Sequence, residues 1–167
     1  MTVGRIVTAG KELQEWMRSI RRTLHQYPEL SFQEYKTSLL IQNTLKELGI
    51  EFRNGWAKTG VIASIRGAES KLSHAHVALR ADMDGLPVSD QKKVDYASKV
   101  PGIMHACGHD GHVAMLLGAA ALLRNKVTRG RVSLIFQPAE EHGNGAQKII
   151  QEGGLADGIK VIFAGHI

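Results

Sequence analysis

The stretch "HVAMLLGAAALLRNKVTRGRVSLIF", residues 112–136, decides the fold. Its first half, residues 112–125, is apolar all round a helical projection, which is typical of a helix buried in the interior. Its last part, residues 131–136, is a short and almost continuously apolar run, which predicts a strand buried on both faces. A buried helix followed by a buried strand indicates an α/β domain.

Two helices are expected near the N-terminus. Apolar residues recur at helical spacing over residues 10–26, and Pro28 stops the pattern. Ser31 and Glu34 match a capping box, which would open a second helix. Gly49 is the expected C-terminal stop of that second helix. The sequence therefore predicts two amphipathic helices before the first strand.

The alternation of helices and strands continues along the chain. The remaining predicted elements are strands at 61–65, 76–80 and 160–165, a loop at 86–104 and a helix at 144–152. Helices between apolar strands predict an α/β fold with a largely parallel sheet covered by helices on both faces. A length of 167 residues suits one compact domain.

Composition excludes several classes of protein. The net charge is +5, but the basic residues are dispersed and aromatic residues make up 5% of the chain, so we expect no nucleic-acid partner. No apolar stretch is long enough to cross a bilayer, and the first residues lack the apolar region of a secretory signal. A single cysteine excludes an internal disulfide. We expect a cytoplasmic protein that does not bind membranes.

Polar clusters lie where the predicted sheet would present its carboxyl edge. "ADMDG" (81–85), "QPAEEHG" (137–143) and "HI" (166–167) each follow a predicted strand, and "HACGHD" (105–110) precedes the buried helix. Ligands of open α/β sheets bind at this edge. The residues expected to converge there are Asp82, Asp84, Cys107, His109, Glu140, Glu141 and His166.

Cys107 and His109 place a thiol and an imidazole close together on a loop. Both groups suit zinc or a similar divalent ion, and Gly108 lets the backbone bend so that both face one ion. Asp110 is a candidate acceptor for a ligating histidine. Two alternatives remain open: Cys107 is inert packing, or it is a nucleophile with His105 or His109 as its base.

Glu140 and Glu141 form an adjacent acidic pair after a buried strand. In an extended turn the two carboxylates point in different directions. One can then bind a metal ion while the other takes a proton from a metal-bound water. The alternative is a solvated acidic turn at the start of a helix.

Asp82 and Asp84 alternate at the end of a strand, so their carboxylates share one face. They are interpreted as ligands, as groups that orient a ligating histidine, or as turn formers. The other histidines are given no role in the site. His25, His74 and His76 have no acidic or thiol partner in the predicted register, while His112 and His142 are unassigned.

Taken together, these motifs resemble the metallo-amidohydrolases that cleave N-acyl amino acids, among them aminoacylase-like, hippurate-hydrolase-like and auxin-conjugate-hydrolase-like enzymes. The matching stretches run in family order over nearly the whole chain. They are "HQYPELSFQEYKTS", "TGVIASIRG", "ALRADMDGLPV", "MHACGHDGHVAMLLGAA", "RGRVSLIFQPAEE" and "FAGHI".

The resemblance implies a set of roles. Two divalent ions (zinc, manganese, cobalt or nickel) would be held by Cys107, His109, Glu141 and His166. Glu140 would be the general acid/base in hydrolysis of the amide between an acyl group and an amino acid. Asp84 would support a ligand, and Asp82 stands where wider relatives carry a ligating histidine.

The sequence departs from the family pattern in two respects. Gly85 stands where the family usually has alanine. Family members run to about twice this length and add a smaller lid or dimerisation domain and a C-terminal part of the catalytic domain. We therefore expect residues 1–167 to form the N-terminal portion of the catalytic domain, and the isolated chain to be weakly active or an inactive fragment. Longer relatives would be homo-oligomeric.

Overall fold

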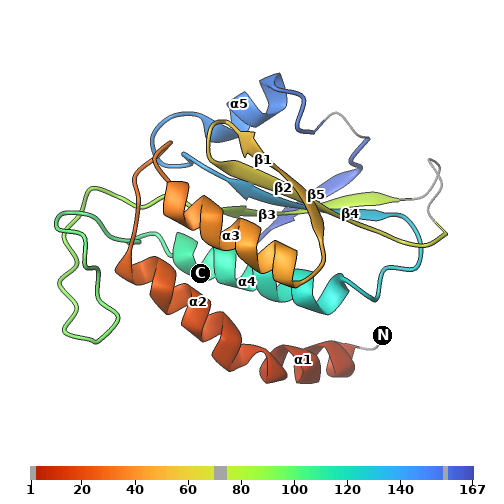
Figure 1. The fold of residues 1–167 in the computed structure, drawn as a ribbon, viewed down its shortest axis with the longest axis horizontal. Coiled ribbons are helices and arrows are strands. Elements are labelled where there is room, and N and C mark those ends of the chain that lie inside the picture. Colours follow the sequence, from red (N-terminus) through yellow and green to blue (C-terminus); the bar gives the residue numbers. More distant parts are fainter. Residues whose placement is uncertain (1–2, 70–74, 156–157) are drawn as a thin grey trace.

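The computed structural model describes residues 3–69, 75–155 and 158–167. A single five-stranded sheet runs through the described part of the chain (Figure 1). The helices are α1 (Val3–Glu12), α2 (Gln14–Gln26), α3 (Tyr35–Glu47), α4 (His109–Leu123) and α5 (Gly145–Gln151). The strands are β1 (Glu51–Trp56), β2 (Gly60–Arg66), β3 (His76–Asp82), β4 (Arg131–Gln137) and β5 (Val161–Ala164). His74 lies outside the described residues.

The sheet confirms the α/β class but is mixed in direction. Its strand order is β1-β2-β4-β3-β5. Strand β3 runs parallel to β4 and to β5, whereas β2 pairs antiparallel with β1 and with β4. The expectation of a largely parallel sheet therefore holds only for its β4-β3-β5 half.

Strand β1 was not predicted from the sequence. Most of its side chains are exposed, so it lacks an apolar pattern. Asn54 and Gly55, a typical turn pair, lie inside the strand next to an irregularity in its register. The turn to β2 lies at residues 57–59, where Ala57 and Lys58 have positive φ. The strand was missed because it lies at the edge of the sheet and because the turn follows the Asn54-Gly55 pair instead of containing it.

The core lies between the sheet and helices α3 and α4, with α2 packed on α4 (Figure 1). Helix α4 was expected from its apolar composition, and Val113 and Leu117 are fully buried in it. Gly118 of α4 allows α2 to come close, because an added Cβ would lie 2.2 Å from the Sδ atom of Met17. Helix α4 is therefore packed between the sheet on one side and α2 on the other.

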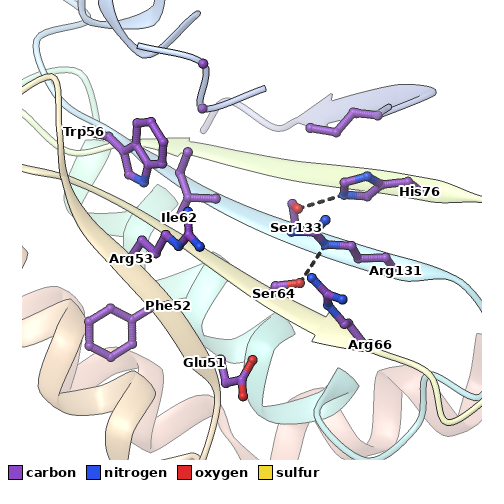
Figure 2. A pocket seen from close by; sticks show the side chains of 13 residues that line it. Glu51, Phe52, Arg53, Trp56, Ile62, Ser64, Arg66, His76, Arg131 and Ser133 are labelled. Atoms are coloured by element: carbon purple, nitrogen blue, oxygen red, sulfur yellow. Dashed lines mark hydrogen bonds between the residues drawn. The ribbon is translucent and has the colours of Figure 1, made fainter. Parts of the chain in front are cut away.

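The opposite face of the sheet is only partly covered. Helix α5 lies on that side (Figure 1), and a pocket of about 630 Å³ opens beside it, over the strands (Figure 2). Its lining includes Arg53, Ser64 and Ser133. Along the neighbouring edge, Ile162 and Phe163 of β5 are exposed. The two groups of described residues suited to a metal ion lie away from this pocket.

The predicted capping box is wrong. Glu34 precedes α3, but its side chain does not cap the helix. Glu29 does so instead, since its carboxylate accepts hydrogen bonds from the backbone amides of Lys36 and Thr37. The hydroxyl of Ser31 and the carboxylate of Glu34 reach other loops.

The first predicted helix is divided. It begins earlier than expected, and Leu13 separates α1 from α2. Within the described ranges, none of the helices is long and apolar enough to cross a membrane.

Candidate metal centre

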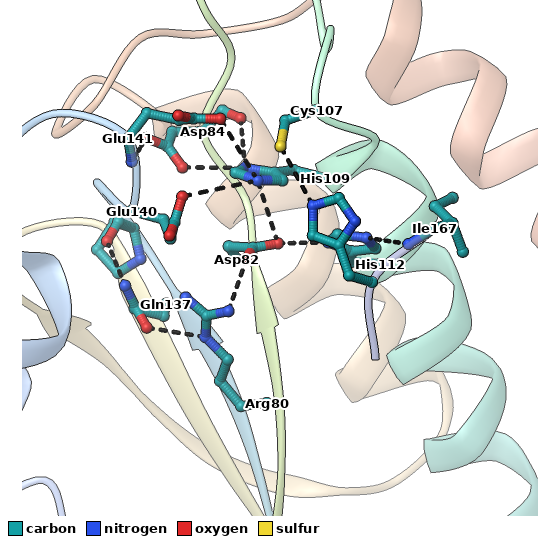
Figure 3. Close-up of polar contacts among 12 residues, drawn as sticks. Arg80, Asp82, Asp84, Cys107, His109, His112, Gln137, Glu140, Glu141 and Ile167 are labelled. Atoms are coloured by element: carbon teal, nitrogen blue, oxygen red, sulfur yellow. Dashed lines mark hydrogen bonds and ion pairs between the residues drawn. The ribbon is translucent and has the colours of Figure 1, made fainter. Parts of the chain in front are cut away.

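The predicted convergence is present in the structure (Figure 3). Asp82 ends β3 and Asp84 follows it, while His109 begins α4. The loop after β4 brings Glu140 and Glu141 to the same place, with the His109 Nε2 atom 3.9 Å and 3.8 Å from their carboxylate oxygens. Three segments far apart in sequence thus meet at the carboxyl edge of β3 and β4.

His109 lies at the centre of this group. Its Nδ1 atom lies 2.9 Å from the backbone oxygen of Asp84 and 3.2 Å from the carboxylate of the same residue. Nδ1 therefore carries the proton and donates it to these oxygens. The Nε2 atom is buried and has no hydrogen-bond partner among the described residues, and it faces Asp82 Oδ1 at 3.6 Å as well as the two glutamates. A buried lone pair among carboxylates suits a cation.

Cys107 and Glu141 complete a group of three ligand atoms around this nitrogen. The atoms offered by Cys107, His109 and Glu141 all lie within 4.8 Å of one another. The Oε1 atom of Glu141 is buried, and it too has no hydrogen-bond partner in the described part of the chain. His166 adds an imidazole, with Nε2 3.2 Å from the Cys107 sulfur. Sulfur, nitrogen and carboxylate oxygen form a donor set typical of zinc and related ions.

A second group contains Asp82, His109 and His112. His112 Nδ1 lies 2.6 Å from Asp82 Oδ1, and its Nε2 accepts a hydrogen bond of 3.1 Å from the amide of Ile167. Both nitrogens of His112 are therefore engaged. Sequence reasoning missed His112, although its position three residues after His109 places both rings on one face of a helix.

The carboxylates set the charge state of the site. Burial opposes ionisation of Asp84, but hydrogen bonds from His109, Ser31 and the amides of Glu141 and Glu140 outweigh it and lower its pKa to about 2. Burial lowers the pKa of His109, yet its bond to Asp84 and the surrounding carboxylates raise it overall. Several carboxylates thus lie within 4 Å of the His109 ring, an arrangement that favours a cation.

Cys107 does not have the properties of a nucleophile. Burial and the neighbouring Glu141 raise the pKa of its thiol to about 11. Its imidazole contact is with His166, not with the expected bases His105 or His109. Burial also lowers the pKa of His105 to about 4, so this ring is neutral at pH 7. The thiol is therefore not activated in the absence of a cation, and a bound ion would have to displace its proton.

Asp110 does not accept a bond from a ligating histidine. Its Oδ2 atom lies 2.7 Å from Nδ1 of His25 and accepts a bond of 3.0 Å from Arg21. The expectation that His25 lacks an acidic partner is therefore wrong. The contact spans 85 residues, which sequence spacing does not reveal. His76 contacts Ser133 at 2.8 Å.

Residues 78–167, more than half of the chain, match the sequence pattern of peptidase family M20/M25/M40. The chain belongs to this family. A thermostable carboxypeptidase of Saccharolobus solfataricus is 49% identical over 161 residues, covering 94% of this chain and 40% of the carboxypeptidase. An N-acetyl-L-cysteine deacetylase of Bacillus subtilis is 49% identical over 156 residues, covering 92% and 36%.

The solved structures agree with this M20 assignment. A Bacillus subtilis protein described as a dinuclear metal-binding peptidase from the M20 family superposes with a TM-score of 0.86 at 45% identity. The match covers 93% of this chain and 44% of that protein. This M20 chain thus spans less than half the length of the proteins it matches.

Proposed function

We propose that the protein containing this chain is a metal-dependent amidohydrolase that hydrolyses the amide bond of N-acyl amino acids. The observation that carries the proposal is the unpartnered, buried Nε2 atom of His109, which faces a thiol and several carboxylates. Similarity to a deacetylase of an N-acyl amino acid and to a dinuclear metal-binding peptidase supports it. Residues 1–167 would supply part of the catalytic domain.

In this proposal Cys107, His109, Glu141 and His166 hold two divalent ions, with Asp82 beside them. Bound ions of this kind polarise an amide carbonyl and lower the pKa of a coordinated water. Asp84 keeps the proton of His109 on Nδ1, so that Nε2 keeps its lone pair for an ion.

Glu140 is the proposed general acid/base. Its carboxylate lies on the ligand-bearing loop, and its side chain is 40% exposed, whereas the ring of His109 is 1% exposed. It is therefore accessible to water and substrate on the open side of the cluster. Glu140 takes a proton from the attacking water and delivers it to the leaving amine.

The test uses the full-length protein, stripped with a chelator and reloaded with zinc, manganese, cobalt or nickel. We expect hydrolysis of N-acetyl and N-benzoyl amino acids only after reloading. The Cys107→Ala variant should lose bound metal. Full activity in the stripped protein, or full metal content in Cys107→Ala, would contradict the proposal.

A second candidate function is cleavage of a C-terminal peptide bond, favoured by the similarity to a carboxypeptidase. The same metal chemistry would serve both reactions. Comparing kcat/KM for N-acetyl amino acids and for matched dipeptides separates the two candidates.

The proposal has three further parts. We propose that the substrate is a small molecule, that the full-length protein is a homo-oligomer, and that it is located in the cytoplasm. Assaying the isolated residues 1–167 tests whether they are active alone.

A further inference from the structure

Glu34 is a buried carboxylate whose role the proposed reaction does not explain. Its side chain is fully buried, and within the described residues it forms no ion pair. One oxygen accepts a hydrogen bond of 2.9 Å from the amide of Ala139, and the other accepts a bond of 2.6 Å from the hydroxyl of Thr59. Burial disfavours the charged form and raises the pKa of Glu34, although the bonds from Thr59 and Ala139 favour the ionised carboxylate.

Ala139 lies directly before the acidic pair and has an unfavourable backbone conformation. Its φ is +50°, in the left-handed region that residues with a Cβ avoid. Its amide is held by Glu34, and its carbonyl accepts a bond of 3.0 Å from the amide of Gly145. Such conformations persist only where surrounding contacts hold them. Glu34 supplies one of the contacts at this residue.

Other strained turns meet at the same place. The non-glycine residues with positive φ in the described chain are Phe32, Ala57, Lys58, Ala139 and Asn144. They belong to three connections: residues 30–34, residues 57–59 and residues 138–145. The carboxylate of Glu34 comes from the first connection and bonds to the other two.

The turn is also fixed on the far side of Glu140. The amide of Glu141 donates a bond of 3.1 Å to Asp84 Oδ2, which also accepts a bond of 2.7 Å from Ser31. Two backbone amides, those of Ala139 and Glu141, are therefore held by buried carboxylates on either side of Glu140. The connection before α3 contributes to both contacts through Glu34 and Ser31.

We propose that Glu34 is a positioning residue, which holds the turn at Ala139 and thereby directs Glu140 and Glu141 towards His109. This inference rests on the proposed function, since it assigns Glu34 to the same reaction. It predicts that Glu34 affects the placement of the acidic pair and the chemical step more than substrate binding.

The experiment compares three variants of the full-length protein. Glu34→Ala removes both bonds. Glu34→Gln keeps an acceptor for the Ala139 amide, while its amide group donates to the Thr59 hydroxyl. Thr59→Val is the matched control, because it removes the other partner of the carboxylate but leaves the bond to Ala139.

For Glu34→Ala we expect kcat to fall about 10- to 100-fold with little change in KM, as for other residues that orient a ligand. The cobalt-loaded protein should show an altered d–d absorption spectrum. Amide hydrogen exchange should become faster over residues 138–145 and stay unchanged in α4. Glu34→Gln should remain within about threefold of wild type, because the acceptor for Ala139 is kept. Thr59→Val should lower the melting temperature without altering kcat or the spectrum.

The inference fails if Glu34→Ala keeps the wild-type kcat, spectrum and exchange, or if Thr59→Val reproduces all its effects. Should Glu34→Ala not fold, Glu34→Asp gives the same comparison, because its carboxylate is one methylene short of the Ala139 amide. A wild-type protein that neither binds cobalt nor hydrolyses amides would overturn the proposed function alone. Hydrogen exchange over residues 138–145 would still test the contact with Glu34.

Discussion

The two acidic pairs at the edge of the sheet differ in what their oxygens do. Asp82 and Asp84 are 3% and 1% exposed, and their carboxylates bond to Arg80, His112, His109 and Ser31. The side chains of Glu140 and Glu141 are 40% and 20% exposed. Glu141 Oε1 has no hydrogen-bond partner among the described residues.

This difference indicates that the aspartate pair and the glutamate pair have different roles. The aspartates are occupied in holding imidazole rings and a loop amide, so their oxygens are committed to fixing geometry. The glutamates face the unpartnered nitrogen of His109 and are accessible for a cation, a water or a substrate. We expect substitutions in the second pair to affect chemistry and those in the first to act through the histidines.

The largest effect is expected for Glu140→Gln in the full-length protein. A general acid/base contributes about 10²- to 10⁴-fold to rate, so kcat should fall by that factor. Bound metal should stay at the wild-type amount, measured by elemental analysis. Retained activity, or loss of metal together with activity, would show that Glu140 does not have the separate role assigned to it.

Asp84→Asn should have a smaller effect on catalysis and a direct effect on metal binding. It removes the charge that keeps the Nδ1 proton on His109, and losses of this kind weaken metal affinity about 10- to 100-fold. Isothermal titration with zinc measures the change. Asp95→Asn, an exposed carboxylate elsewhere, is the control and should match wild type. Equal zinc affinities for wild type, Asp84→Asn and Asp95→Asn would show that Asp84 does not support metal binding through His109.

Metal affinity should also depend on pH. The pKa of the Cys107 thiol is about 11, so at pH 7 an incoming ion must displace its proton. The raised pKa of His109 acts in the same direction. Affinity should therefore rise with pH between 6 and 8, about tenfold per unit for each proton released. Titrations in buffers of different ionisation enthalpy count the protons, and a pH-independent affinity would contradict thiol ligation.

The smallest effect is expected for Ser31→Ala. It removes one hydrogen bond from Asp84, which keeps its bonds from His109 and the amide of Glu141. A loss of about 1 kcal/mol in the free energy of unfolding is typical of one such bond. Urea denaturation measures it. Ser19→Ala gives the comparison, because the exposed hydroxyl of Ser19 donates a hydrogen bond to the backbone oxygen of Trp16 in its own helix.

The sequence predicted the buried elements well because burial produces clear apolar patterns. Helix α4 and strand β4 were predicted in this way. The predicted ends of the strands also placed Asp82, Asp84 and the glutamate pair at one edge of the sheet, as the structure has them. Strand β1 was missed because it lies at the sheet edge with mostly exposed side chains.

Local motifs failed where side chains bond across the fold. Ser31 and Glu34 have capping-box spacing, but their oxygens meet Asp84, Thr59 and Ala139 instead. These partners are more than 20 residues away in sequence, so no local spacing predicts them. Such long-range polar contacts form only when tertiary packing brings the loops together.

X-ray absorption at the zinc edge of the zinc-loaded, full-length protein tests most directly whether these distant loops bind an ion together. We expect a zinc–sulfur distance of about 2.3 Å, nitrogen and oxygen ligands at about 2.0–2.2 Å, and loss of the sulfur signal in Cys107→Ala. A wild-type spectrum with nitrogen and oxygen ligands only would contradict it.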